Sequence, residues 1–402
     1  MKLNRRTFLG TASAAATLGA PTILRAQPSE YVLGASLPLT GPFATAGALI
    51  APVLTMVQEL TNANGGIGGV PLRVVTDDSG YIPQNALANY QRLLATEGDK
   101  VVGYYGDSTG FMKLVAPELT GANARLMAST SFASELANPE QNPYQFLSGP
   151  TYEDQFDILL QNIVAQGGSS VAFIHSDTEF GEDPIEHGRE VAEELGLEVV
   201  LVEATKPQGA DIPTHVTKLA QSNAEFAILQ GYVTGVWPQL IGGARQFGLP
   251  TQFMGTFWGM EGLIANRVTA EAGPFLDGYQ GVMPYRYWDE ADQAPRYQEF
   301  AGFMSQAFVG TPLENYMPTW GLQALCGLDI MIRSMRDTAE AGKELTADNL
   351  VETMDGIENY DMGGYFGGPV ASLASHKIGT GRVYQYSAET TSFAPVSDWF
   401  NV

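Results

Sequence analysis

Short apolar runs alternate along the chain with longer segments in which apolar residues recur at every third or fourth position. The run Tyr31–Gly41 ends in a Pro/Gly turn, and the segment from about Ala46 to Asn62 then shows helical spacing. The Gly-rich stretch Asn62–Pro71 ends this helix, and Leu72–Asp78 follows with the pattern of a strand. The pattern therefore predicts a strand–helix–strand unit at the start of the chain.

The same alternation continues to about residue 280. Helices are predicted at Pro83–Glu97, Asp183–Leu195 and Pro213–Ser222, with strands at 101–106, 125–130, 170–175, 198–204 and 225–231. Alternating strands and helices predict parallel sheets with covered faces, an α/β fold. The alternation restarts near Ser148, and a mature chain of about 376 residues is too long for one ordinary core. We expect two lobes, 27–148 plus 280–355 and 149–279 plus 356–402, with a ligand cleft at the carboxyl ends of the strands.

Residues 1–26 have the pattern of an export signal rather than of a folded segment. A basic start is followed by a small, weakly apolar middle, and the segment ends at Ala26, where we expect cleavage. The pair Arg5-Arg6 resembles a twin-arginine signal, a receptor-read address. An ordinary secretory signal with a chance arginine pair is the alternative. No cysteine follows the cleavage region to carry a lipid anchor.

Charge and cysteine content narrow the classes of partner. The leader holds four of the 21 Lys and Arg residues and none of the 44 Asp and Glu, so the mature chain has a net charge of −27. This charge argues against nucleic acid and anionic membrane surfaces as partners. The single cysteine, Cys326, has no internal partner for a disulfide and lies on an apolar helical pattern, where a buried thiol is expected.

The stretch GDSTG, residues 106–110, admits two chemical interpretations. It matches the G-x-S-x-G pattern of a hydrolase nucleophile elbow, with an apolar run before it and a helical run after it. It is also typical of a helix N-terminus, where free N–H groups and the Ser108 hydroxyl favour a carboxylate or carbonyl oxygen. A second place of this kind is MASTSFASEL, where Ala128, Ser129 and Thr130 follow a predicted strand.

The enzymatic alternatives are poorly supported. A hydrolase needs a base for Ser108, and the candidates are His175, His187, His215 and His376. No two histidines have the spacing of a helical metal site. Pro71 stands at the third glycine position of GGIGGVP, so the dinucleotide fingerprint is incomplete. We therefore expect no catalytic residue, no metal and no cofactor.

Longer stretches carry a family resemblance. LGASLPLTGPFATAG, then LTNANGGIGGVPLRVVTDDSGYIPQNALANYQRLL and KVVGYYG, resemble the periplasmic solute-binding proteins of ABC importers. The similarity is to the leucine/isoleucine/valine-, amide- and urea-binding receptors and covers residues 30–400. HSDTEFGED and NYMPTWGLQALCGLDIMIRSM fit the later part of the pattern. The resemblance implies two Rossmann-like lobes joined by three hinge crossings, the type I periplasmic binding fold, with no catalysis.

The resemblance also implies site residues. Segments matching Ser108, Ala128, Ser129 and Thr130 hold the ligand's carboxylate in that family. Tyr152, just past the first crossing, is expected to cover the ligand from the second lobe, as is Tyr232 at a later strand end. The plainer alternatives are that the Ser and Thr residues only cap helices and that Tyr152 packs on the hinge.

One loop departs from the family pattern. Amino-acid receptors of this family usually carry an acid shortly after a glycine here, to pair the ligand's ammonium, but this chain has Thr256, Phe257 and Trp258. A buried ammonium without a partner is costly. Glu261 or another acid therefore reaches in, or the ligand has no α-ammonium. The aromatic residues of this region favour a flat or apolar ligand body.

Together these observations predict an exported, monomeric receptor of an ABC importer that delivers its solute to membrane permease and ATPase subunits. The ligand is expected to be a small carboxylate-bearing solute. The sequence supports a hydrophobic amino acid and an aromatic or aliphatic carboxylate or amide equally. A role in sensing rather than transport is a further alternative that the residues do not exclude.

Overall fold

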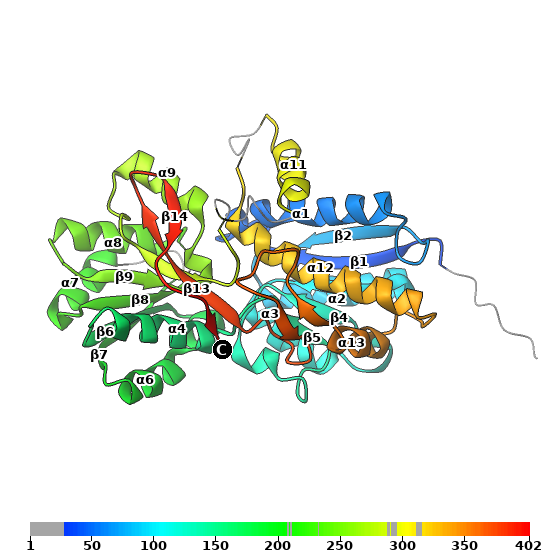
Figure 1. Cartoon of the computed structure of the whole chain (residues 1–402), viewed down its shortest axis with the longest axis horizontal. Helices are drawn as coiled ribbons and strands as arrows, with labels where there is room; N and C mark the ends of the chain where they lie inside the picture. Colours follow the sequence, from blue (N-terminus) through cyan, green and yellow to red (C-terminus); the bar gives the residue numbers. More distant parts are fainter. Residues whose placement is uncertain are drawn as a thin grey trace, which may run out of the picture.

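Two α/β bodies lie side by side along the long axis of the molecule, each built on one central sheet (Figure 1). The structure, a computed structural model, describes residues 28–206, 209, 211–231, 233–287, 290, 296–310 and 316–402. The predicted class, two Rossmann-like lobes with parallel-type sheets, is confirmed. The body on the right of Figure 1 is called lobe 1 and the body on the left lobe 2.

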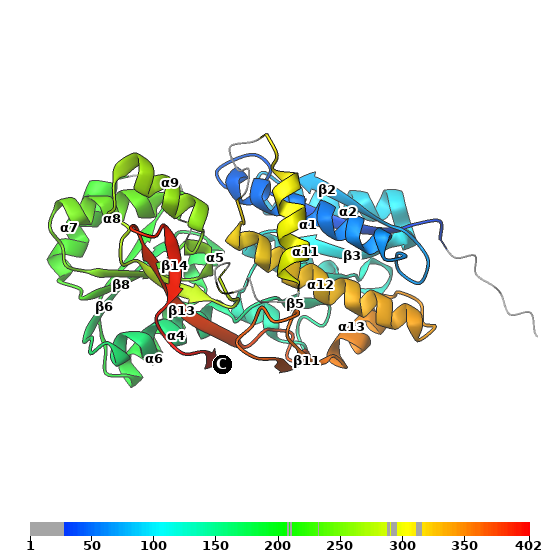
Figure 2. The same cartoon turned by 45° about the horizontal axis from the view of Figure 1, so that its top comes forward.

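Lobe 1 contains a five-stranded parallel sheet in the order β2-β1-β3-β4-β5. Its strands are β1 (Tyr31–Leu37), β2 (Leu72–Asp78), β3 (Val101–Gly106), β4 (Leu126–Ser129) and β5 (Gln145–Leu147). Its helices are α1 (Ala44–Ala63), α2 (Pro83–Glu97), α3 (Thr109–Val115), α11 (Tyr297–Ala307), α12 (Thr319–Glu340) and α13 (Ala347–Asp355), with short 3-10 turns that include η4 (Ser134–Ala137). Figure 2 shows α11 lying over α1 and α12.

Lobe 2 contains a larger mixed sheet in the order β14-β13-β10-β9-β8-β6-β7, with β15 paired to β13. Its strands are β6 (Ser170–Ser176), β7 (Glu198–Thr205), β8 (Phe226–Gln230), β9 (Gln252–Gly255), β10 (Gln280–Met283), β13 (Thr380–Ser387), β14 (Ser392–Pro395) and β15 (Phe400–Asn401). Its helices are α4 (Tyr152–Ala165), α5 (Glu179–Glu182), α6 (Ile185–Glu194), α7 (Ile212–Ser222), α8 (Val236–Gln246), η5 (Phe257–Gly259) and α9 (Gly262–Ala272). Strands β6 to β10 run parallel, whereas β13 and β14 pair antiparallel.

Helix α1 is long and apolar enough to cross a membrane by length and composition, but its position is that of a covering helix. It packs on α12 and β2, and half of its most apolar window is buried. Leu49, Ile50 and Val53 on its inner face are at most 1% exposed. The 3.6-residue period that predicted this helix therefore reflects burial against the lobe 1 core.

The chain passes between the sheets three times, after β5, between β10 and α11, and between β12 (Val370–Ser372) and β13. The first two passages contact each other, because the Tyr285 hydroxyl donates to the Ser148 carbonyl over 2.5 Å. The third is tied to the start of α4 by a 2.7 Å bond from Lys377 to Asp154. Helix α4 begins directly after the first passage with a capping box between Thr151 and Asp154.

Two of the predicted lobe limits need correction. The limit at residue 280 falls at the start of β10, a strand of the lobe 2 sheet, so lobe 2 extends to Met283. The limit at 356 is too early, because β11 (Glu358–Tyr360) and β12 stay with lobe 1. The Tyr360 hydroxyl bonds Asp329 of α12, and the His376 carbonyl accepts the Leu147 amide of β5. The chain enters lobe 2 for the last time only at β13.

Candidate functional site

The carboxyl ends of β3 and β4 place two predicted site residues in direct contact. Gly106 and Ser129 are register partners in these strands, so the loops that follow start side by side. The Ser108 amide donates to the Thr130 hydroxyl oxygen over 2.9 Å, and the Ser108 hydroxyl oxygen accepts the Phe111 amide over 3.2 Å. Each hydroxyl oxygen accepts one bond and keeps its own proton, which a ligand oxygen can accept.

The side chains of the neighbouring residues Ala128 and Ser129 point into the protein, away from the Ser108–Thr130 contact. Both are 0% exposed. The Ser129 hydroxyl accepts the Ser131 amide in a local turn, and the Ala128 methyl group faces Gly327 of α12. The structure thus brings Ser108 and Thr130 together and turns the side chains of Ala128 and Ser129 into the protein. Ligand contact through their backbone stays a prediction.

Lobe 2 presents an aromatic cluster to this part of lobe 1. The Trp258 indole N–H donates to the Tyr152 hydroxyl over 3.1 Å, so the Tyr152 oxygen accepts and its proton is available. Burial raises the pKa of Tyr152 and keeps it a neutral donor. Phe132 of lobe 1 links the two groups: it follows Thr130 by two residues, its carbonyl accepts the Tyr152 amide, and its ring meets Tyr152 and Phe257 edge-on.

Two buried glutamines fix the loop that carries Thr256 and Phe257. The Gln155 side chain of α4 accepts the Phe257 amide over 2.9 Å. The Gln230 side chain accepts the Thr256 hydroxyl over 2.7 Å and donates to the Phe180 carbonyl. The Thr256 hydroxyl is therefore used within lobe 2. Tyr232, the remaining predicted contact, lies outside the described residues.

Glu261, the acid displaced from its expected place, is completely buried at the N-terminus of α9. It accepts the Trp320 amide of α12 over 3.0 Å, the Tyr316 hydroxyl, and the Leu263 amide of its own helix over 3.3 Å. Burial raises the pKa of this carboxyl to about 7, against the opposing effect of the hydroxyl and amide donors. Its carboxylate therefore bridges the two lobes.

A second acid lies inside the GDSTG motif itself. The Asp107 carboxyl is 2% exposed and accepts the Ser79 hydroxyl of the loop after β2, on the side away from Thr130. Burial raises its pKa to about 6. Asp107 thus joins the loops that follow β2 and β3, whereas Ser108 bonds Thr130 in the loop after β4.

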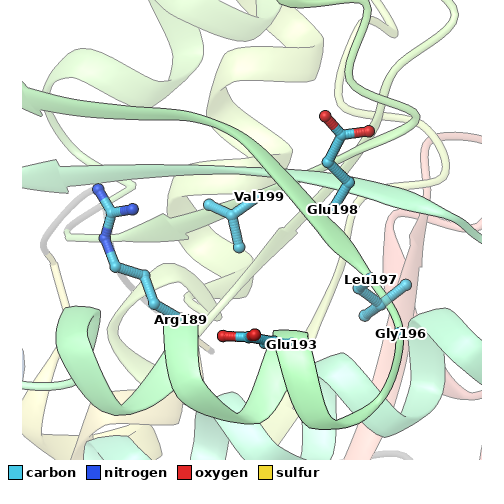
Figure 3. A pocket seen from close by; sticks show the side chains of 6 residues that line it. All are labelled: Arg189, Glu193, Gly196, Leu197, Glu198 and Val199. Atoms are coloured by element: carbon cyan, nitrogen blue, oxygen red, sulfur yellow. The ribbon is translucent and has the colours of Figure 1, made fainter.

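Two cavities lie away from this junction. One of about 440 Å³ opens on the outer surface of lobe 2, between α6 and the start of β7 (Figure 3). Its lining combines the charged side chains of Arg189, Glu193 and Glu198 with the apolar side chains of Leu197 and Val199. The other, of about 110 Å³, lies between α1 and α12. Neither contains a predicted site residue.

Comparison with known proteins decides the family. The sequence profile of the periplasmic binding protein family matches residues 30–392. The chain belongs to this family. Periplasmic binding proteins are exported, although the predicted signal, residues 1–26, lies outside the described residues. The predicted recognition and the type I periplasmic binding fold are both confirmed.

Individual similarities agree on the fold and differ in the ligands that they name. The Leu/Ile/Val-binding protein of Escherichia coli is 26% identical over 80% of this chain and 86% of its own length. A branched-chain amino acid ABC transporter structure from Thermus thermophilus with bound valine matches with a TM-score of 0.80 at 20% identity, over 93% of this chain and 97% of that one. A fatty acid ABC transporter substrate-binding protein from Thermomonospora curvata matches with a TM-score of 0.79 at 20% identity, over 93% and 92%.

The four histidines named as candidate bases for Ser108 have other partners in this binding protein. His175 contacts the Ser176 carbonyl, His187 contacts Asp157, His215 contacts Glu203, and His376 contacts the Gln145 carbonyl and Asp355. None of these four side chains bonds Ser108. Across the described residues, no group of three His, Cys, Asp or Glu side chains is arranged to hold a metal ion.

Sequence reasoning missed several residues that shape this binding protein's junction. They are Phe132, Gln155, Phe180, Gln230, Tyr316 and Trp320. Phe132 has a usable signal, because it stands two residues after Thr130 in the quoted stretch. The two glutamines have none, since their partners lie up to 102 positions away.

Proposed function

We propose that this periplasmic binding protein is the solute receptor of an ABC importer and captures a small carboxylate between its lobes. The observation that carries the proposal is the junction of hydroxyl donors and aromatic rings. Ser108 and Thr130 offer protons from lobe 1, and Tyr152 offers one from lobe 2, beside the rings of Phe132 and Trp258. Hydroxyl donors suit carboxylate oxygens, and the rings suit an apolar body.

Two ligand classes fit this arrangement. A branched-chain or other hydrophobic amino acid is favoured by the relatives, since the Escherichia coli protein and the Thermus thermophilus structure are named for such ligands. An amine-free aromatic or aliphatic carboxylate, with amides or urea as related alternatives, is favoured by Glu261, whose oxygens already bond Tyr316 and Trp320. The Thermomonospora curvata protein, named for fatty acids, has the same fold.

The mechanism that we propose is conformational. The ligand binds first to lobe 1, and closure of lobe 2 is a population shift that depends on contacts made better in the closed form. The closed form then docks on a membrane permease driven by an ATPase subunit. We expect a monomer, exported by the twin-arginine signal and cleaved after about Ala26, with no cofactor and no catalytic residue.

Calorimetry on protein lacking residues 1–26, unfolded and refolded to remove carried-over solute, tests the proposal. Leucine and 4-methylpentanoate share one carbon skeleton and differ only in the α-amine. Binding of either compound, weakened by Thr130→Val, supports the carboxylate receptor. Preference for leucine would assign an acid to the ammonium, and preference for 4-methylpentanoate would assign the amine-free class. Failure of both compounds and of a wider carboxylate panel to bind would contradict the proposal.

A further inference from the structure

Glu261 connects the two lobes through hydrogen bonds to residues of both. It belongs to lobe 2, where it is the N-cap of α9. Its partners in lobe 1 are Trp320, at the start of α12, and Tyr316, which precedes that helix. One carboxylate oxygen accepts the Trp320 amide and the other accepts the Tyr316 hydroxyl. The Tyr316 oxygen in turn accepts the Leu263 amide of α9. Donors of both lobes thus converge on one buried side chain.

The helix geometry strengthens this contact. Trp320 is the second residue of α12, which runs for 22 residues, so its amide is one of the N–H groups without a partner inside the helix. The N-cap residue of α12, Pro318, offers no N–H and no side-chain cap to this end. A carboxylate at the N-terminus of a long helix also interacts favourably with the helix dipole. Glu261 therefore supplies from lobe 2 the cap that α12 lacks in lobe 1.

Aromatic contact accompanies the polar one. The rings of Trp258 in lobe 2 and Trp320 in lobe 1 lie 5.6 Å apart, centroid to centroid. Gly262, directly after Glu261, comes so close to Tyr287 that a Cβ atom there would lie 2.1 Å from its hydroxyl oxygen. The backbone next to Glu261 is therefore held closely within lobe 2, and the two indole rings add an apolar contact between the lobes.

We propose that Glu261 is a positioning residue that holds the lobes closed by capping α12, and that it does not bind the ligand. The proposal goes beyond the solute-receptor function, because closure is measurable in the absence of solute. It also implies that closure depends on a contact that is the same for every ligand, so the α-amine is not needed to complete it.

Two variants separate this role from a merely structural one. Glu261→Ser keeps a good N-cap for α9, but a serine side chain is too short to reach α12. Tyr316→Phe leaves the glutamate in place and removes one cross-lobe donor. Glu271→Ser is the matched control, since Glu271 is on the same helix, is exposed and pairs only with Arg267 among the described contacts. Melting curves identify any variant that does not fold, and Tyr316→Phe keeps the test valid if Glu261→Ser fails.

Small-angle scattering and tryptophan emission of the solute-free proteins provide the first measurement. We expect a larger radius of gyration and red-shifted emission for Glu261→Ser and Tyr316→Phe, and no change for Glu271→Ser. Calorimetry with leucine and 4-methylpentanoate provides the second, and there we expect each variant to weaken whichever of them binds by about tenfold, equally for both if both bind. If neither binds, the receptor proposal fails and the scattering result alone decides the role of Glu261.

Two results would overturn the assignment. A loss confined to leucine in Glu261→Ser, with Tyr316→Phe unaffected, would make Glu261 the partner of a ligand ammonium. Unchanged dimensions together with unchanged affinities in both variants would show that the contact has no part in closure.

Discussion

At the scale of single residues, the Thr130 hydroxyl has one observed role and one that we propose. Its oxygen accepts the Ser108 amide, which fixes the loop after β3, and we propose that its proton is donated to a ligand oxygen. Sequence reasoning placed both hydroxyls directly after buried strands, at one edge of a parallel sheet, and the family resemblance implied their contact with a ligand, which stays a prediction. It could not separate them from Ser129, whose side chain turns back to the Ser131 amide, because that turn depends on local backbone geometry.

Replacing Thr130 by Val removes the proton donor at constant shape. We expect a carboxylate ligand to bind about 10- to 100-fold more weakly, because hydrogen bonds to charged groups contribute about 1.5–3 kcal/mol. The Ser108 amide also loses its acceptor, so the free energy of unfolding should fall by about 1–3 kcal/mol. Calorimetry and denaturant titration measure the two effects. Thr130→Ser is the control and should restore both, whereas unchanged affinity in Thr130→Val would remove this residue from the site.

Glu261 makes stability depend on pH in a defined direction. Burial raises its pKa from the ordinary 4.5 to about 7 in the folded protein. Below pH 4.5 it is protonated in both states. Between pH 4.5 and 7 the unfolded chain releases the proton and the folded chain retains it, so this contribution to stability is lost as pH rises.

The glutamine variant isolates that titration. Glu261→Gln resembles the protonated acid at every pH. The pH-dependent contributions of all other groups to the free energy of unfolding therefore cancel when the variant is compared with the wild type. We expect the free energy of unfolding of the wild type, relative to Glu261→Gln, to fall by at most about 3 kcal/mol between pH 4.5 and 8. Urea titrations across this range give the difference. A difference that rises with pH would mean that the donors around Glu261 hold its charged form.

At the scale of elements, the aromatic cluster depends on segments far apart in the chain. Phe132 follows β4, Tyr152 opens α4, and Phe257 and Trp258 form η5. Periodicity predicted the helices and strands well, because it records which face of each is buried. It did not predict the glutamines that fix η5, since their contacts follow from tertiary packing. The predicted last lobe limit falls at the end of α13 and is too early, because β11 stays with lobe 1 through tertiary contacts such as that of Tyr360 with Asp329.

Trp258→Ala tests whether this cluster contacts the ligand body. Removing the indole also removes the bond to Tyr152, so some loss is expected for any ligand. We expect a bulky or aromatic carboxylate to lose at least about tenfold more affinity than a short one, because more of its apolar surface loses a partner. Calorimetry with benzoate and acetate series compares them. Equal losses across ligand sizes would place Trp258 in the protein core only.

At the scale of the whole molecule, contacts between the two lobes occur at separate places along their interface. Lys113 of α3 approaches Glu179 and Asp183 of lobe 2 at 3.8 and 4.0 Å, while Glu261 bonds α12 elsewhere on the interface. The two lobes and their crossings were predictable from the restart of the strand–helix pattern and the family resemblance. The contacts that close them were not, because each joins residues from different sheets.

A thermal-shift panel on refolded protein lacking residues 1–26 tests the central claim most directly. The panel contains branched and aromatic amino acids, their amine-free carboxylates, benzoates, short amides and urea. The account predicts that a carboxylate stabilises the protein, by about 2.7 kcal/mol at a hundred times its dissociation constant. The shift should be smaller in Thr130→Val than in the wild type. Stabilisation by neutral amides or urea alone, or by no compound in the panel, would contradict a carboxylate receptor.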